Sequence, residues 1–391
     1  MNDIKHIHPF PARMAPDIAL EHVRDLPENA LVGDPMCGSG TVLRVAAESG
    51  HRCIGFDLDP LAVLMSRVWT TPIDLTAVRA GAADLVNAGK QVSDDVSLPW
   101  MDKCSETTAF VERWFEPAQR SPLRRLAYLL APRTGPISDV LRLALSRTIV
   151  TKERGASIAR DTSHSRPHTW FVANNYDVWK GFEFAVDRLA ARLRPEKLTG
   201  EVVVNKGDAR DLPAVPNGVV DAIISSPPYL NAIDYLRGHR LALVWLGYGL
   251  RELRAIRAVS IGTELAARAV PSETISWWLD AAGDTRRLPR RERGMLQRYA
   301  EDVVRMLDEA RRVLKPDGRM TLVVGNSRLQ DIFIENSKIV ELAARATGFK
   351  ALRSTTRDLL VANRYLPISR NAKASALDKR MKEEVILTLA A

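Results

Sequence analysis

The chain has 391 residues, of which 46% are hydrophobic and 26% are charged, and its formal net charge is +9. This composition is typical of globular proteins, no apolar run approaches the ~18 residues of a membrane span, and the first residues carry no secretory signal, so we expect a cytoplasmic protein without membrane association. The basic balance favours a polyanionic partner such as nucleic acid, because phosphate contacts supply most non-specific affinity, although many basic proteins bind none.

Residues 1–70 alternate between strand and helix patterns. Apolar residues at helical spacing, short apolar runs and glycine punctuation predict the elements. These are a helix at 17–25, a strand at 30–33, a helix at 41–50, a strand within 51–60 and a helix at 60–69. The β-α-β-α order predicts a Rossmann-like, doubly wound α/β sheet, of which residues 1–70 would form the N-terminal, cofactor-binding part.

The strand pattern stops after this region. Residues 71–198 are mainly helical and polar in pattern, and we interpret them as a large insertion. The sheet resumes in residues 199–391, which would form the catalytic part of the same domain. Its predicted elements are strands within 200–212 and 218–229, a helix at 235–249, an irregular basic insertion at 251–294, a long helix from 295, a Pro-Asp-Gly turn at 316–318 with a strand after it, a helix at 337–349, and strands at 359–362 and 385–389.

The cysteines Cys37, Cys53 and Cys104 have no metal-ligand spacing. Their odd number argues against a disulfide framework and fits a reducing compartment. We therefore expect no metal site.

A glycine-rich turn, DPMCGSGT, lies between the first predicted strand and its helix. Glycines at this place let the backbone approach a ligand closely. The turn is not a phosphate-binding Walker loop, and Leu43 stands where the full dinucleotide pattern has its third glycine. Asp34 at the strand end suits a cationic amino group. The alternative is a tight strand–helix turn without a ligand.

Acidic residues also end the next two strands. Asp57 lies about 20 residues after the glycine turn, the spacing at which such folds hold ribose hydroxyls. Asp59, before Pro60, reads as a helix N-cap. Asp208 follows the next strand, where it would meet an adenine amino group; the alternative is again a helix cap.

The stretch SSPPY ends the strand within 218–229 with a stiff corner, because proline cannot donate to a sheet ladder and restricts its preceding residue. The corner offers a hydroxyl at Ser226, a carbonyl at Pro227 and a flat ring at Tyr229. This set can hold an exocyclic amino group and stack its base. It contains no cysteine nucleophile, so it predicts direct attack by an amino nitrogen. The alternative is a plain proline turn.

These residues resemble the S-adenosylmethionine-dependent amino-methyltransferases of the DNA methylase family. The motifs that carry the resemblance are HPFPARM, DPMCGSGT, GFDLDP, GDARDL and SSPPYLNAIDYLRGHRLALVWLG, and they leave out the insertion. In that family Asp/Asn/Ser-Pro-Pro-Tyr/Phe/Trp is the catalytic corner, and the Ser-Pro-Pro-Tyr form is typical of N4-cytosine enzymes. The resemblance therefore implies a methyltransferase sheet, S-adenosylmethionine as cofactor and a flipped cytosine in DNA as substrate.

The resemblance also implies roles by position. The catalytic corner would comprise Ser226, Pro227, Pro228 and Tyr229. The methionine part of the cofactor would lie against Asp34, Met36, Gly38 and Gly40, with Thr41 capping the next helix. The remaining cofactor contacts would be Asp57 on the ribose, Leu58 on the adenine face, Asp208 and Ala209 on the adenine edge, and Phe10, Pro11 and Arg13 as an N-terminal lid.

Several alternatives stay open at this point. The base could be adenine, methylated at N6, or a base in RNA. A different class is a non-catalytic nucleic-acid-binding module, against which the intact Asp34, Gly38, Asp57 and Tyr229 argue. The sequence leaves open the recognition site, a cognate restriction endonuclease, and the choice between monomer and dimer.

In this sequence the large insertion interrupts the cofactor domain itself. We hypothesise that it reads DNA through a loop at 159–171, against the alternative of a solvated structural loop. The basic run 285–294 would clamp the DNA backbone, or form a solvated face. Trp277 and Trp278 are expected in the core rather than stacked on bases. The candidate nucleic-acid contacts are Arg160, Arg166, His168, Asn231, Asp234, Arg290 and Arg291, of which Asn231 and Asp234 could instead cap a helix.

Overall fold

The structure is a computed structural model that describes residues 6–10, 13–160, 167–169, 173–230, 235–261, 273–330, 332–358 and 383–391. Several predicted features lie outside these residues. They are Pro11, Arg166, Asn231, Asp234 and the candidate strand at 359–362.

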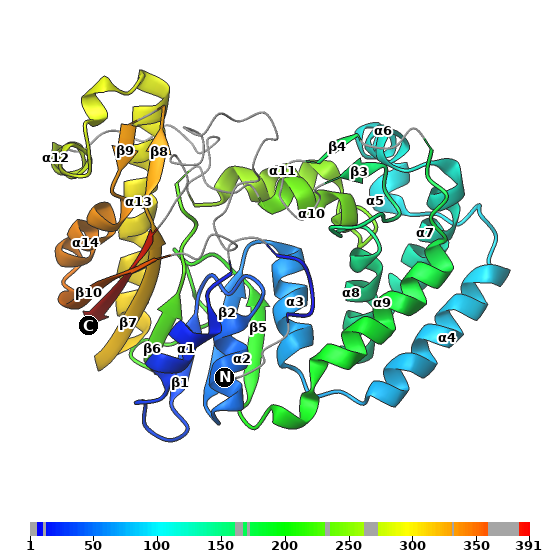
Figure 1. The fold of residues 1–391 in the computed structure, drawn as a ribbon, viewed down its shortest axis with the longest axis horizontal. Coiled ribbons are helices and arrows are strands. Elements are labelled where there is room, and N and C mark those ends of the chain that lie inside the picture. Colours follow the sequence, from blue (N-terminus) through cyan, green and yellow to red (C-terminus); the bar gives the residue numbers. More distant parts are fainter. Residues whose placement is uncertain are drawn as a thin grey trace.

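The core of the fold is a seven-stranded sheet with the order β10-β11-β7-β6-β1-β2-β5 (Figure 1). Its strands are β1 (Leu31–Asp34), β2 (Arg52–Asp57), β5 (Val202–Lys206), β6 (Val220–Ser225), β7 (Leu314–Gly325), β10 (Lys350–Asp358) and β11 (Glu383–Ala390). Strands β5, β2, β1, β6 and β7 are parallel, and β11 runs antiparallel to both of its neighbours. The predicted doubly wound α/β fold is thus confirmed.

Helices cover both faces of the sheet, which is why its central strands are apolar along their length. Alternate residues of β6 and β7 join different cores, as strand geometry requires. Ile224 and Val323 pack on the side of α1 (Pro16–Val23) and α2 (Thr41–Glu48). Ile223, Leu322 and Val324 pack on the side of α13 (Arg290–Val313) and α14 (Asn336–Ala346).

The order of the strands reverses between β1 and β6. The chain leaves β1 toward β2 and β5 on one side, and then returns to β6 on the other. Ligands of open α/β sheets bind at such a switch point, outside the carboxyl ends of the strands. Asp34, Asp57 and Ser225 are the last residues of β1, β2 and β6, so all three lie at this edge.

The insertion is mainly helical, as predicted, and Figure 1 shows its helices gathered beside α3 (Pro60–Thr70). It contains α4 (Leu75–Gln91), α5 (Pro99–Asp102), α6 (Ser105–Trp114), α7 (Pro117–Leu130), α8 (Pro136–Arg147), the short strands β3 (Ala159–Arg160) and β4 (His168–Thr169), and α9 (Val178–Leu193). These helices share one core with α3, α10 (Tyr235–Leu243) and α11 (Leu250–Val259).

Buried Arg44 of α2 fastens this insertion to the sheet domain. Its guanidinium donates to the carbonyls of Trp69 at 2.8 Å and Leu193 at 2.9 Å, and also to that of Arg194. Its Nε pairs with Glu48. A single side chain therefore holds the end of α3, just before the insertion, next to the end of α9, the last helix of the insertion.

The prediction that residues 251–294 are irregular is wrong for most of the described residues in this range. Its described elements include α11, α12 (Glu273–Ala281) and the start of α13. In α11 the buried residues Leu250, Leu253 and Ile256 recur at helical spacing, a pattern that the many arginines obscure in the sequence.

One prediction about a strand needs correction, and three strands were not predicted. The Pro-Asp-Gly turn falls inside β7, where the pairing with β6 jumps from Leu314 to Arg319, so it forms a bulge in a continuous strand. The sheet edge β10 and the hairpin of β8 (Ser327–Leu329) and β9 (Ile332–Ile334) were not predicted, because β10 is mostly exposed and β8 and β9 are very short.

Within the described part of the chain, no helix combines the length and the apolarity needed to cross a membrane. Among the same residues, no three His, Cys, Asp or Glu side chains are grouped so that they could hold a metal ion.

Candidate active site

The buried carboxylate of Asp34 stands at the switch point. The Ser225 hydroxyl, at the end of β6, donates to its Oδ1 at 2.7 Å, and the Met36 N–H donates to the same oxygen at 3.2 Å. Burial, with the charge of nearby Asp57, raises the pKa of Asp34 to about 7. A cationic ligand group beside Oδ2 would favour the ionised form, because an opposite charge offsets part of the cost of burial.

The glycine turn after β1 is built around positive φ angles, at +51° for Gly38 and +84° for Gly40. A Cβ on Gly40 would lie 2.9 Å from Cα of Ser66 on α3. A Cβ on Gly38 would lie 3.1 Å from the ring of Phe10. Gly40 therefore serves the close approach of two helices, while Gly38 underlies the N-terminal segment.

Thr41 is not the helix cap that we expected. The N-cap of α2 is Gly40, and Thr41 is the first helical residue. The Thr41 hydroxyl is buried and has no hydrogen-bond partner within the described residues. An unpaired hydroxyl at a helix N-terminus suits an anionic ligand group such as a carboxylate.

Asp57 holds the glycine turn and the next helix at the same time. Its Oδ2 accepts the Gly38 N–H at 2.9 Å, and its Oδ1 accepts the Asp59 N–H at 2.9 Å. Burial, with the charge of Asp59, raises the pKa of Asp57 to about 7. Each carboxylate oxygen has a second lone pair, so both can still accept a ligand hydroxyl. The neighbouring Leu58 is half-buried against the core that α3 shares with the insertion.

Asp59 is the N-cap of α3, as predicted, because its Oδ1 accepts the Leu61 N–H at 2.9 Å. Its Oδ2 lies 2.5 Å from Nδ1 of His239 on α10. The sequence analysis missed His239. A histidine inside an apolar helix just after the corner was the available signal.

Asp208 has a partner that the sequence did not suggest. Its two oxygens accept from Arg210 at 2.9 and 2.6 Å, and Arg210 also reaches Asp302 on α13. Burial opposes the ionisation of Asp208, but the hydrogen bonds and charge of Arg210 outweigh it and hold the pKa below its usual range. A contact with an adenine edge would have to share this carboxylate with Arg210. The next residue, Ala209, is buried.

The Pro-Pro corner is fastened to the neighbouring strand. The Ser226 hydroxyl donates to the carbonyl of Val323 on β7 at 3.1 Å, and its oxygen lies 3.3 Å from the Tyr229 hydroxyl. Because the one hydroxyl proton of Ser226 goes to Val323, the Tyr229 hydroxyl is the donor to Ser226, and one lone pair of the Ser226 oxygen is left to accept from a ligand. Pro227 is buried, and Pro228 and Tyr229 are half-buried.

The N-terminal segment lies over the glycine turn. The Phe10 ring stacks on Tyr235 of α10, with centroids 5.0 Å apart and planes at 16°. His8 is buried and bonds Ser146 of α8 at 2.8 Å, so the segment is anchored on the insertion. The structure thus brings Phe10 to the place expected for a lid; Arg13 is half-buried nearby in sequence.

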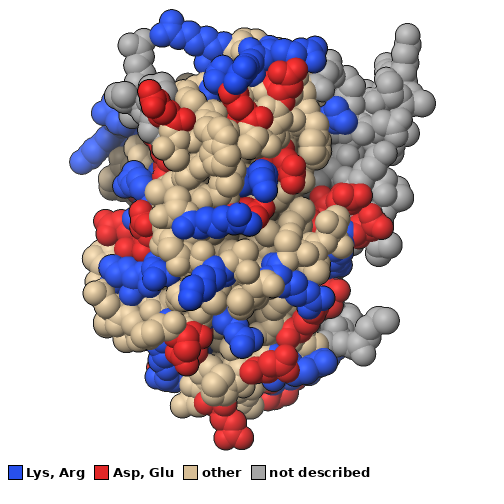
Figure 2. Space-filling view, turned by 90° about the vertical axis from the view of Figure 1, so that its left-hand side faces the viewer, with Lys and Arg blue, Asp and Glu red and all other residues tan. Residues whose placement is uncertain are grey.

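The candidate nucleic-acid contacts fall into two groups. Arg160 and His168 pair across the β3–β4 hairpin, where His168 is exposed. Arg290 and Arg291 begin α13 and are exposed. Figure 2 shows Lys and Arg gathered at the upper end of the face that contains α12, and Figure 1 places the β3–β4 hairpin on the other side of the molecule. The two groups therefore flank the sheet.

The two adjacent tryptophans of α12 divide between core and surface. Trp278 is 5% exposed and belongs to the core, as predicted. Trp277 is 61% exposed, so the prediction of a core position is wrong for this residue.

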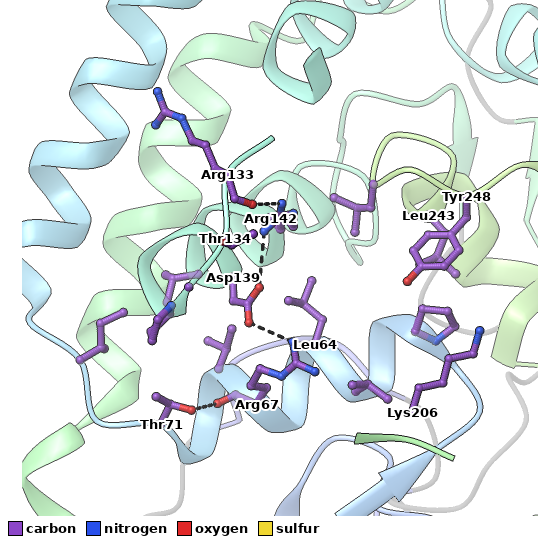
Figure 3. Close-up of a pocket in the computed structure, with 18 residues that line it drawn as sticks. Leu64, Arg67, Thr71, Arg133, Thr134, Asp139, Arg142, Lys206, Leu243 and Tyr248 are labelled. Carbon is purple, nitrogen blue, oxygen red and sulfur yellow. Dashed lines mark hydrogen bonds and ion pairs between the residues drawn. The ribbon is translucent and has the colours of Figure 1, made fainter. Parts of the chain in front are cut away.

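A pocket of ≈ 510 Å³ lies beside the candidate site, between α3, the start of α8 and the turn after α10 (Figure 3). Arg67 and Arg142 reach across its wall to Asp139. On the opposite wall lie Leu243 and Tyr248. The sequence analysis did not predict this pocket.

No family model matches the chain. The Type II methyltransferase M.MvaI of Kocuria varians is 21% identical over 98% of this chain and 90% of its own length. The Type II methyltransferase M.MjaII of Methanocaldococcus jannaschii is 30% identical over 105 residues, which are 26% of this chain and 20% of that protein.

Two of the solved structures found by comparison are the following. A putative DNA modification methylase from Thermus thermophilus is 17% identical, with a TM-score of 0.23 over 47% of this chain and 50% of that chain. The rRNA methyltransferase aviRa from Streptomyces viridochromogenes is 12% identical, with a TM-score of 0.35 over 100% and 91%. Both TM-scores are too low to support an argument. Over nearly its whole length, the chain is similar in sequence to a Type II DNA methyltransferase.

Proposed function

We propose that this protein is a DNA amino-methyltransferase that uses S-adenosylmethionine and methylates N4 of cytosine. The observation that carries the proposal is the juxtaposition of two motifs at one sheet edge. Ser225 donates to Asp34, and the next residue, Ser226, begins the Pro-Pro corner. The carboxylate that would bind a cation and the corner that would hold an amino group therefore lie at the ends of adjacent strands, β1 and β6.

The residues at this edge fit the cofactor. S-adenosylmethionine supplies a methyl group on a sulfonium and also carries an ammonium, a carboxylate and ribose hydroxyls. Asp34 would hold the ammonium, Asp57 the ribose hydroxyls, and Thr41 with the α2 N-terminus the carboxylate. Burial and a neighbouring carboxylate raise the pKa values of both acids to about 7, and a positive ligand group at Asp34 and hydroxyl donors at Asp57 would favour their ionised forms.

The corner would prepare the target nitrogen. An exocyclic amino group is conjugated with its ring and is a poor nucleophile. By accepting its two N–H groups, the Ser226 oxygen and the Pro227 carbonyl would draw the nitrogen toward sp³ geometry and aim its lone pair at the methyl carbon. Tyr229 would stack on the flipped base, with its hydroxyl held at Ser226.

The reaction balances without a protein base. A nitrogen–carbon bond forms while the carbon–sulfur bond breaks, and its electron pair stays on sulfur. The nitrogen then loses a proton to water, leaving methylated base and S-adenosylhomocysteine. Alignment and hydrogen bonds would supply most of the rate acceleration.

DNA is the substrate that the net charge of +9 and the Type II methyltransferase relative support. The preference for cytosine rests on the serine in the first corner position. N6 of adenine is the alternative within the same mechanism, and an RNA base is the alternative in substrate class.

The decisive experiment is tritium transfer from labelled S-adenosylmethionine to unmethylated genomic DNA and, in parallel, structured RNA, with mass spectrometry of the nucleosides. We expect N4-methylcytosine from the wild type, and at least ~100-fold less from Ser226→Ala and Tyr229→Ala. Tyr128→Ala, at an exposed position of α7, is the matched control and should keep full activity. N6-methyladenine would overturn the choice of base, label in RNA alone the choice of substrate, and absence of label from both the proposal itself.

A further inference from the structure

A buried side-chain pair ties the helix after the corner to the end of β2. His239 of α10 and Asp59 are 2% and 7% exposed, and Nδ1 of His239 lies 2.5 Å from Oδ2 of Asp59. The other oxygen of Asp59 caps α3. One carboxylate therefore sets the position of two helices. Because both side chains are buried away from water, separating them would cost free energy.

From this pair, hydrogen bonds continue to the glycine turn. The Asp59 N–H donates to Asp57, and the other oxygen of Asp57 accepts the Gly38 N–H. Three successive bonds thus run from His239 to Gly38. Asp57, which the proposed function assigns to the ribose, lies on this path, and Gly38 at its end belongs to the turn between Asp34 and Thr41.

An aromatic contact runs beside the same path. The Phe10 ring packs against His239, with centroids 5.6 Å apart, and against Tyr235, one turn earlier on α10. Phe10 also covers Gly38. Two sets of contacts therefore link the glycine turn to α10. One is the series of hydrogen bonds through Asp57 and Asp59, and the other is the packing of the Phe10 ring.

Farther along, a pocket lies between α3 and the turn after α10. The pocket in Figure 3 separates Leu64 of α3 from Leu243 and Tyr248. Near the corner α10 and α3 share an apolar core, and the His239–Asp59 pair adds a buried polar contact between α10 and the N-terminus of α3.

We propose that His239 and Asp59 are positioning residues that couple the cofactor site to the base site. The inference rests on the proposed function. A ligand on Asp57 and the glycine turn would stabilise the arrangement in which Asp59 holds His239, and hence the placement of α10 behind the Pro-Pro corner. Each ligand therefore raises the affinity for the other by the same factor, since such coupling is reciprocal.

The test measures this factor directly. Calorimetry gives the affinity of sinefungin, a cofactor analogue that cannot donate a methyl group, with and without saturating sheared, unmethylated plasmid DNA. For the wild type we expect DNA to tighten sinefungin binding by about fivefold or more. His239→Ala should reduce the factor to about one, while His239→Asn, which keeps a donor near the place of Nδ1, should restore most of it.

Two further variants separate positioning from general damage. Asp59→Ser keeps a side-chain oxygen that can cap α3 but cannot reach His239, so it should lose the coupling while the N-terminus of α3 stays capped. The double variant of Asp59→Ser and His239→Ala should be no worse than either single variant. His51→Ala is the matched control, because His51 is buried against α1, away from the path, and should leave the factor unchanged.

The outcomes distinguish the two proposals. A wild type that binds neither sinefungin nor DNA refutes the proposed function. A wild type that binds both without coupling, or a coupling that survives both His239→Ala and Asp59→Ser, overturns the inference about the pair and leaves the proposed function standing. If His239→Ala does not fold, Asp59→Ser and His239→Asn decide the question.

Discussion

Replacing Asp34 by asparagine should stabilise the ligand-free protein and weaken cofactor binding. The difference between an ordinary carboxyl pKa of 3.8 and about 7 corresponds to ~4 kcal/mol, at ~1.4 kcal/mol per pKa unit. Between these values the folded protein holds the proton more tightly than the unfolded chain does. The cost of ionised Asp34 therefore develops as the pH rises, and it is complete above about pH 7.

Asparagine removes this charge and keeps an Oδ1 for the Ser225 hydroxyl and the Met36 N–H. The charge of nearby Asp57 contributes to the raised pKa of Asp34 along with burial. We therefore expect the free energy of unfolding to rise by about 1–3 kcal/mol at pH 8, rather than by the full ~4 kcal/mol. The lost charge–charge contact with the cofactor ammonium should weaken binding by about 10- to 100-fold, from ~1.5–3 kcal/mol for a charged hydrogen bond.

Urea unfolding at pH 8 without ligand measures the first effect, and calorimetry with S-adenosylmethionine measures the second. Asp84→Asn, on the exposed face of α4, is the matched control and should change neither quantity. A destabilised Asp34→Asn protein, or one that binds the cofactor as tightly as the wild type, would refute the reasoning that Asp34 is a strained carboxylate held for a cation.

Binding of S-adenosylmethionine should tighten from about pH 6 to about pH 8, because burial raises the pKa values of Asp34 and Asp57 to about 7. The cofactor ammonium favours ionised Asp34, and hydroxyl groups that donate to Asp57 favour its ionised form. Calorimetry in two buffers of different ionisation enthalpy should record proton release, and proton uptake would contradict the assignment. Arg44→Met should lower the free energy of unfolding in urea by about 3–5 kcal/mol, because it leaves half-buried Glu48 and three carbonyls without their donor. Arg24→Met, at an exposed position, should cost almost nothing. Gly40→Ala should destabilise more than Gly135→Ala: both positions have positive φ, but only at Gly40 does the new Cβ meet backbone, at 2.9 Å from Ser66, while nothing lies within 4 Å at Gly135. Equal losses in thermal unfolding would show that strain alone, not the approach of α3, explains Gly40.

The elements predicted with success were those whose local signals agree. The turn after β1, the strand β2 and the helix α3 are marked by apolar runs, by glycine or proline, or by helical spacing. They appear within a few residues of the predicted limits. The acids at strand ends were predictable for the same reason, since parallel strands bring their carboxyl ends to one edge. Elements with conflicting signals were missed. In α11 arginines hide the apolar face, and in β7 a Pro-Asp-Gly sequence lies inside a strand.

The roles of individual side chains divide in the same way. The sequence by itself determined which residue types end the strands, because strand periodicity and turn residues are local properties of the chain: Asp34, Asp57 and the Ser226–Tyr229 corner each follow a predicted strand. Only the tertiary structure decided their partners. Ser225 on Asp34, Arg210 on Asp208, His239 on Asp59 and Phe10 over Gly38 join segments far apart in the chain. Such contacts depend on how whole elements pack in three dimensions, which no local pattern encodes.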